Sequence, residues 1–280
     1  MPDKSLTTRI RNRLRRDSKR LYWRTAPSDA QRRTILFIVG SQRSGTTMLL
    51  DMFEKDWRSR TFSEFSSITE DIPDGIRLKP LDDVCRIFAS SGEPFIVCKP
   101  LVESQRTRDL LEYFPRSRAL WTYRDYHDVV SSNVKFFRSR SVKSCRIVVD
   151  GEPGHWQSEV VPERALELIR RHYHAGMSPH DAAALMWYAR NCLYFEQDLD
   201  MLPSVRLWKY DDFVRSPTTN AYQIYAWLKM APPGRRTMNF VNPRSVGLGQ
   251  GVTLDAEIEG ACRELMDRLD TKADARSAAI

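Results

Sequence analysis

The chain has 280 residues, of which 41% are apolar, 10% aromatic and 29% charged. This composition is ordinary for a soluble globular enzyme and excludes collagen-like, low-complexity and wholly disordered chains. The formal charge of +8 comes from residues 1–33, which hold 11 basic and 3 acidic residues, because the other 33 basic and 33 acidic residues balance. The excess charge therefore belongs to an N-terminal arm and does not make the whole protein a specific nucleic-acid binder.

The arm, residues 1–33, carries Ile10, Leu14 and Leu21 at roughly helical spacing. We expect a solvated, partly helical extension, and two alternatives stay open: contact with a membrane surface or phosphate polymer, and docking on a partner subunit. The nearby apolar run over 35–39 is far shorter than the roughly 20 residues of a membrane helix. The arm also lacks the apolar segment of a secretion signal, so we expect a cytoplasmic protein, with peripheral membrane contact as the alternative.

Four apolar runs typical of β-strands are each followed by a segment typical of a helix. The runs are Thr34–Val39, Pro94–Cys98, Arg118–Tyr123 and Val205–Trp208, and the helices are expected over Thr46–Lys55, Glu103–Phe114, Tyr126–Arg138 and from Pro217 onward. This alternation favours parallel strands with right-handed crossovers. The predicted fold is a single α/β domain over residues 34–272, with a central parallel sheet flanked by helices and a P-loop-like nucleotide-binding arrangement.

The rest of the chain has weaker patterns. Residues 139–177, which include Gly151 and Pro153, are predicted to form a mobile or lid-like insertion. A helix with a core-facing stripe is expected from Pro179, and a last helix over Leu254–Leu269, with residues 273–280 as a frayed tail. The five cysteines are widely spaced and odd in number, which favours neither a disulfide framework nor a zinc site, and we expect no metal.

The sharpest motif is a tight turn between a strand and a helix, over residues 37–50. In such a turn the first N–H groups of the helix point at one spot and, with the helix dipole, form an anion site. Gly40 and Gly45 have the spacing of a phosphate-binding loop and let the chain approach a phosphate closely. A nucleotide hydrolase needs Lys after the second Gly, but Thr46 stands there, and the cation is Arg43, inside the turn.

At this turn the sequence resembles the PAPS-dependent sulfotransferases, where PAPS is 3′-phosphoadenosine-5′-phosphosulfate. The family motif has Pro, then Lys or Arg, then Ser or Thr, then Gly-Thr, and ends on Ser or Thr. Here Gln42 replaces the Pro. The resemblance implies that the 5′-phosphosulfate is bound by Gln42, Arg43, Ser44, Gly45, Thr46 and Thr47.

A second anion site is predicted where Arg124 ends a strand and Ser132 lies two turns into the next helix. An arginine and a hydroxyl so placed can converge on one dianion. Family members carry an Arg, Asp and Ser pattern here, matched by Arg124, Asp128 and Ser132, with Tyr126 in place of the usual Pro. The resemblance implies that Arg124 and Ser132 bind the 3′-phosphate of PAPS.

Looser matches extend the resemblance over about residues 34–270, closest to the bacterial-type and tyrosylprotein-type branch. They include Lys99 at a strand end and the stretch 207–213. Arg244 and Ser245 stand where family members close over the nucleotide, so the resemblance implies that both bind it.

Sulfuryl transfer needs a base for the acceptor and positive groups where charge develops. The segment after the first helix has no histidine, and Glu64 stands where the resembling branch has a catalytic glutamate. A carboxylate between Phe62 and Phe65 is expected to be partly desolvated, and Glu70 and Asp71 are its rivals. Arg43 and the amides of Thr46 and Thr47 are the candidates to stabilise the leaving group, with Lys99 as the cation for the sulfonate.

The sequence therefore predicts a sulfotransferase that moves a sulfo group from PAPS, without a metal, to an acceptor hydroxyl or, less readily, an amine. Carbohydrate, lipid, peptide and small-metabolite acceptors stay open, as does the oligomeric state. One alternative is a kinase-like phosphotransferase, which the missing loop lysine disfavours. The other is a non-catalytic module whose basic arm binds phosphate or a membrane.

Overall fold

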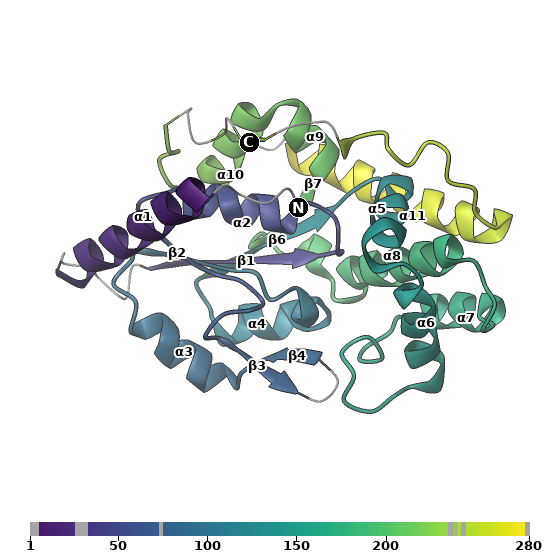
Figure 1. Cartoon of the computed structure of the whole chain (residues 1–280). Coiled ribbons are helices and arrows are strands. Elements are labelled where there is room, and N and C mark those ends of the chain that lie inside the picture. The colour runs from purple at the N-terminus through teal and green to yellow at the C-terminus, as the bar shows by residue number, and fades with distance from the viewer. Residues whose placement is uncertain are drawn as a thin grey trace.

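Five parallel strands form the centre of the computed structural model, which describes residues 6–25, 33–72, 75–234, 238, 240–241 and 245–277. The strands lie in the order β2-β5-β1-β6-β7 (Figure 1). Their bounds are β1 Thr34–Gly40, β2 Ser59–Phe62, β5 Phe95–Cys98, β6 Ser117–Tyr123 and β7 Val205–Lys209. All four pairings are parallel, which confirms the predicted sheet.

Alternating side chains of β1 divide the core into two layers, as expected for a strand buried on both faces. Leu36 and Ile38 pack with helices α2, α9 and α10, and Phe37 and Val39 pack with α4, α5, α8 and α11. Figure 1 shows α2, α9 and α10 above the sheet and α3 and α4 below it. The bounds are α2 Thr46–Glu54, α3 Leu81–Ala89, α4 Thr107–Tyr113, α5 Tyr126–Phe137, α8 Pro179–Glu196, α9 Tyr210–Arg215, α10 Pro217–Trp227 and α11 Ala256–Ser277.

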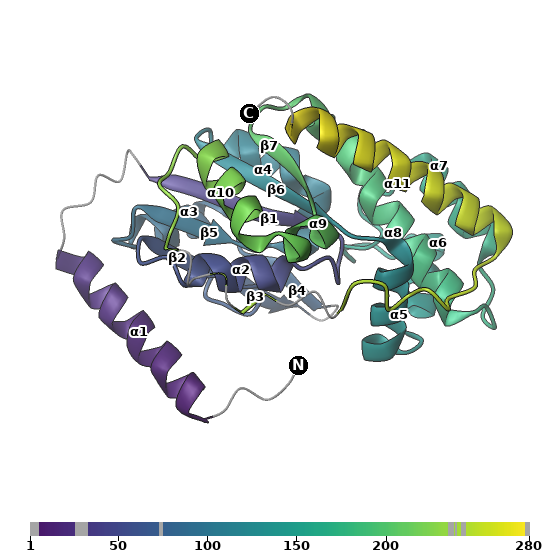
Figure 2. The same ribbon diagram turned by 90° about the horizontal axis from the view of Figure 1, so that it is seen from above.

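The segment 139–177, for which the sequence predicted a mobile or lid-like insertion, has regular secondary structure. It contains helices α6 (Arg140–Asp150) and α7 (Glu163–His172), which pack beside α8 at the right of Figure 2. Cys145 and Val148 on α6, and Ala165 and Ile169 on α7, are buried at the three- and four-residue spacing of a helix face. The glycines that weakened the pattern lie in the connection between the two helices.

The stretch before β5 contains β2 and an antiparallel hairpin of β3 (Thr69–Ile72) and β4 (Gly75–Leu78). Arg77 of the hairpin pairs with Glu103 at 2.8 Å and with Glu159 at 2.7 Å. Glu103 also accepts a hydrogen bond from the Leu78 amide. The helix predicted over Glu103–Phe114 begins as a 3₁₀ turn, η2 (Leu101–Arg106), before α4 continues it.

Residues 6–25 of the arm form one helix, α1 (Leu6–Thr25), and this helix lies against the domain instead of extending into solvent. The Lys19 ammonium is buried and donates hydrogen bonds to the main-chain oxygens of Glu54 at 3.1 Å and Asp56 at 2.8 Å. Burial lowers the pKa of Lys19. The Trp23 indole donates to the Trp57 carbonyl at 2.8 Å, so the C-terminal half of α1 is anchored to the end of α2 and the loop that follows it.

The last helix is longer than predicted. α11 continues past Leu269 to Ser277, so residues 273–277 of the expected frayed tail are helical. Asp270, the first residue past the predicted end, accepts hydrogen bonds from the Tyr123 hydroxyl at 2.8 Å and the Lys209 ammonium at 2.7 Å. The helix is thus fixed to strands β6 and β7 beyond the predicted end.

Two further observations concern the chain as a whole. All five cysteines are unpaired. Among the helices in the described part of the chain, none combines the length and apolar character that crossing a bilayer requires.

Candidate functional site

The carboxyl ends of all five parallel strands meet at one edge of the sheet, where open α/β folds bind their ligands. This edge holds Glu64 after β2, Lys99 after β5, the glycine turn after β1, Arg124 after β6 and Tyr210 after β7. A cavity of about 500 Å³ opens there between the turn, α5, Tyr210 and the segment 245–248. Its size is that of a small-molecule binding site.

The turn after β1 has its predicted shape, and both of its glycines are required. Gly40 has a φ of 116° and Gly45 a φ of 82°, a region that other residues rarely adopt. A side chain at Gly40 would overlap the Thr122 main chain, and one at Gly45 would overlap the Tyr210 ring. The turn therefore fits closely against both β6 and the residue that follows β7.

The N-terminus of α2 provides the first set of anion-binding groups. Gly45 precedes the helix and caps it with no side chain, so the first amides of α2 are not used by a cap. Thr46 and Thr47 both line the cavity. The Ser44 hydroxyl is buried and has no hydrogen-bond partner among the described residues. These groups are donors of the kind that phosphate or sulfate oxygens accept.

Arg124 provides the second set. Its guanidinium is buried, lies 4.7 Å from the centre of the Tyr210 ring, and donates from Nη2 to Asp128 at 3.0 Å. Its Nε atom has no partner within the described part of the chain. A buried arginine with an unused donor beside the cavity suits an anionic ligand.

Asp128 connects Arg124 to the loop that closes one side of the cavity. Its two carboxylate oxygens accept hydrogen bonds from the amides of Gly247 at 2.9 Å and Gly249 at 2.7 Å. Ser245 completes this connection, because its carbonyl accepts from Arg124 and its hydroxyl lies 2.6 Å from the Tyr210 hydroxyl. Arg244, the other residue predicted here, lies outside the described residues.

Arg43 lies closer to the second anion site than the sequence suggested. Its Nε donates to the Ser132 hydroxyl at 3.0 Å, and its guanidinium stacks on Phe136 at 4.0 Å. Burial, and then the nearby charge of Arg124, lower the pKa of Arg43. Its backbone φ of 64° is unusual for a residue other than glycine. Arg43 thus crosses the cavity between the turn and α5.

Glu64 and Lys99 form an ion pair of 2.7 Å at the same edge. They meet because β2 and β5 are parallel neighbours and the Lys99 amide bonds to the Phe62 carbonyl at 2.9 Å. The Lys99 ammonium also lies 3.4 Å from the Thr47 hydroxyl, which connects the pair to the turn. The apolar cleft expected around Glu64 is absent on one side, because Phe65 is 82% exposed.

Gln42, Glu70 and Asp71 lie outside the cavity of about 500 Å³. Gln42 lines a neighbouring cavity of about 400 Å³ with Arg140 and Trp156, not the larger cavity. Glu70 and Asp71, the rivals of Glu64, are exposed on β3.

Two residues of the cavity, Asp128 and Tyr210, were part of the motifs but were not predicted to belong to the site. The signal for Asp128 was its place between Arg124 and Ser132 in the second motif. The signal for Tyr210 was its place in the stretch 207–213, but its contact with Gly45 follows only from the fold. The described residues contain no group of three or more His, Cys, Asp or Glu side chains able to hold a metal.

Comparison of the sequence with models of protein families and with curated proteins finds no match. Among solved structures, the sulfotransferase domain from the curacin biosynthetic pathway matches with a TM-score of 0.55 and 14% identity, over 85% of this chain and 98% of that chain. The chain has the sulfotransferase fold. The sulfotransferase domain of the Synechococcus PCC 7002 olefin synthase also matches, with a TM-score of 0.53 and 14% identity over 87% and 97% of the two chains. Both matches cover more than four fifths of this chain and nearly the whole of the other domain.

Proposed function

We propose that this chain is a sulfotransferase that moves a sulfo group from PAPS to an acceptor hydroxyl, or less readily an amine, and releases adenosine 3′,5′-bisphosphate. The observation that carries the proposal is that one cavity joins two sets of anion-binding groups at the carboxyl edge of the sheet. PAPS has phosphate groups at two separated positions, which is what two such sets would bind. The sulfotransferase fold of the chain supports the same function.

The donor would be held at both ends. Ser44, Thr46, Thr47 and the amides of the turn would bind the 5′-phosphosulfate, and Arg124 and Ser132 would bind the 3′-phosphate. Among the described residues the buried Ser44 Oγ and Arg124 Nε have no hydrogen-bond partner, and this supports the fit, because a bound phosphate oxygen would satisfy them. Ser245, and by resemblance Arg244, would close over the nucleotide.

The transfer itself would use the ion pair after β2 and β5. The Glu64 carboxylate would accept the proton of the acceptor hydroxyl as its oxygen bonds to sulfur. The bond from sulfur to the bridging oxygen then breaks, and the negative charge leaves with the 5′-phosphate of the bisphosphate. Lys99 is placed for the sulfonate, since it contacts both Glu64 and Thr47. Fixed positive groups at this point lower the barrier.

Arg43 has a less direct role in this proposal. Its guanidinium now contacts Ser132, so the side chain has to turn toward the loop to stabilise the leaving phosphate. In its present position it would add a second cation for the 3′-phosphate. Each positive charge in this proposal comes from an arginine or lysine side chain of the protein.

The test compares two nucleotides by titration calorimetry with the full chain. We expect adenosine 3′,5′-bisphosphate to bind and ATP with Mg²⁺ to bind far more weakly, because the turn lacks the lysine that holds a γ-phosphate. Incubation with PAPS and a cell extract should then produce compounds with added SO₃ mass. Preferred binding of ATP with Mg²⁺ would point to a phosphotransferase, and no binding of either nucleotide would point to a non-catalytic module.

A further inference from the structure

Helix α1 is amphipathic, but it lies on the domain with its polar face inward. Successive residues of an α-helix turn by about 100°, so Ile10, Leu14 and Leu21 fall on the side opposite Lys19. Lys19 is buried, whereas Ile10 is 51% exposed, Leu14 62% and Leu21 65%. A surface helix normally does the reverse and packs its apolar stripe on the core.

Specific polar contacts maintain this orientation. Lys19 is bonded to two main-chain oxygens and lies 3.3 Å from the Ser59 hydroxyl. Arg15 donates to the Lys55 carbonyl, and Trp23 donates to the Trp57 carbonyl. A side chain at Gly92 would overlap the Trp23 carbonyl, so the chain passes close to the end of α1. Rotating α1 to bury its leucines would remove these contacts together.

The outward face combines apolar and basic side chains. Arg13, Arg20 and Arg24 are exposed beside the apolar stripe. The helix as a whole has eight basic residues and one acidic residue, Asp17. Asp17 lies 4.0 Å from Arg13 and from Arg20 and cancels one unit of this charge, so the helix keeps a large positive excess.

We propose that α1 binds the surface of membranes that contain anionic lipids and so holds this protein at the bilayer. Such a surface offers negative headgroups for the arginines and an acyl layer for the leucines, which is the combination that interfacial helices recognise. A polyanion would neutralise the arginines but would leave the apolar stripe in water. A second copy of the chain would bring eight more basic residues against the first eight.

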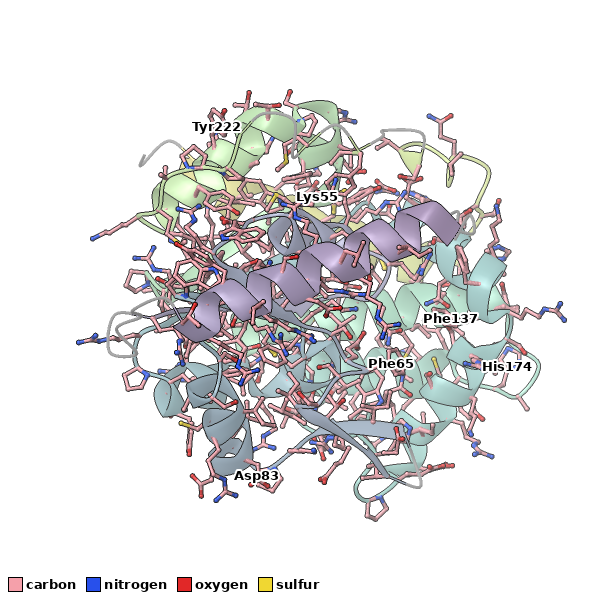
Figure 3. All side chains as sticks on the ribbon, turned by 60° about the vertical axis from the view of Figure 1, so that its left-hand side comes forward. Lys55, Phe65, Asp83, Phe137, His174 and Tyr222 are labelled. Carbon is pink, nitrogen blue, oxygen red and sulfur yellow. The ribbon has the colours of Figure 1, made fainter. Side chains whose placement is uncertain are left out.

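The position of Phe65 supports the proposal that this side of the molecule faces the membrane. Figure 3 shows α1 crossing the front of the molecule, with Phe65 labelled below it. A cavity of about 370 Å³ is lined by Arg16 and Arg20 of α1, by Thr47 of the turn and by Phe65. Phe65 is the most exposed of the large apolar side chains in the described part of the chain. The membrane-facing side therefore includes the residue next to Glu64.

The experiment is co-sedimentation of the full-length protein with vesicles. One vesicle is phosphatidylcholine alone, and the other is phosphatidylcholine with an equal amount of phosphatidylglycerol. We expect binding to the mixed vesicles only, weakened by added salt. The double change Leu14→Glu and Leu21→Glu should weaken binding by at least about tenfold, because each leucine loses its transfer into the acyl layer. Met201→Glu, which removes another exposed apolar side chain away from α1, is the matched control.

Since Leu14 and Leu21 are exposed, the double variant should keep the wild-type thermal transition and its affinity for adenosine 3′,5′-bisphosphate. The membrane result is thus independent of the proposed enzyme activity. Equal binding of wild type and double variant to the mixed vesicles overturns the proposal, as does equal binding to both vesicle types. Binding to heparin or RNA but not to vesicles would show that the outward face of α1 recognises polyanions. A wild-type dimer that the double variant cannot form would show that this face binds a second copy of the chain.

Discussion

At the scale of single residues, the candidate site depends on how closely Tyr210 approaches the turn after β1. The ring occupies the space where a side chain at position 45 would lie, and its other neighbour is the Arg124 guanidinium at 4.7 Å. The tyrosine hydroxyl then reaches Ser245. One aromatic side chain therefore sets the distance between the turn, the buried arginine and the closing loop.

The first residue to test is Arg124. Arg124→Ala should weaken the binding of adenosine 3′,5′-bisphosphate by about 1.5–3 kcal/mol, the value of a hydrogen bond to a charged group. Titration calorimetry measures this directly. Arg170→Ala makes the same charge change at an exposed site on α7 and should leave the affinity unchanged. An affinity for the Arg124 variant equal to wild type would remove Arg124 from the nucleotide site.

Glu64 is the second residue to test. Glu64→Gln keeps the shape of the side chain but cannot accept the acceptor proton, so turnover should fall by about 10²–10⁴-fold. Bisphosphate affinity should stay near that of wild type, since Glu64 bonds to Lys99 and not to the anion-binding groups of the turn. The measurement is the single-turnover rate with PAPS, with the exposed Glu167→Gln as control. Full activity of the Glu64 variant would exclude it as the base.

At the scale of elements, the loop after α2 is where several parts of the molecule meet. Asp56 in this loop is buried and accepts hydrogen bonds from Arg58 at 2.7 and 3.0 Å and from the Tyr225 hydroxyl at 2.9 Å. Burial alone would raise the pKa of Asp56, but the bonds from Arg58 and Tyr225 hold it below its ordinary value. The carboxylate thus ties α2 to α10 and stays charged in the folded protein.

This lowered pKa predicts a pH dependence of stability. A carboxyl whose pKa is lower in the folded than in the unfolded protein stabilises the fold above its unfolded pKa, near 4, and loses that contribution as the pH falls through the folded value. Asp56→Asn should therefore reduce the free energy of unfolding by about 1–3 kcal/mol at neutral pH. Urea titrations should show that the difference in the free energy of unfolding between this variant and wild type narrows below about pH 4. The exposed Asp267→Asn should show no such gap, and a gap independent of pH would contradict the ionic role of Asp56.

Local patterns predicted single elements well, but not how they meet. Four of the five parallel strands could be found from runs such as 34–39, because a parallel strand is apolar along its whole length. A helix was predicted after each of them, although α9, which directly follows β7, was missed. Helices α6 and α7 were missed since the glycines between them hid two short periodic stretches. Likewise, the ion pair between Arg77 and Glu103 joins a hairpin to a 3₁₀ turn, and no spacing pattern in the sequence predicts this contact.

At the scale of the whole molecule, the candidate site follows from the strand order. Placing β1 between β5 and β6 brings Lys99, the glycine turn and Arg124 to one edge, and the motifs predicted these residues individually. The sequence could not predict that Arg43 would cross to Ser132, because that depends on where α5 lies relative to the turn. The inward polar face of α1 was unpredictable for a similar reason: its partners are main-chain oxygens.

The main-chain acceptors of Lys19 determine which substitutions in the arm and in the domain are compatible with the docked helix. Every residue type offers the same backbone oxygen, so substitutions at positions 54 and 56 leave two of the acceptors of Lys19 in place. The same holds for Arg15 and Trp23, which also donate to main-chain oxygens. The docking of α1 therefore depends on the side chains of the helix itself, and substitutions in the segment that receives it are tolerated as long as the main chain of that segment keeps its shape.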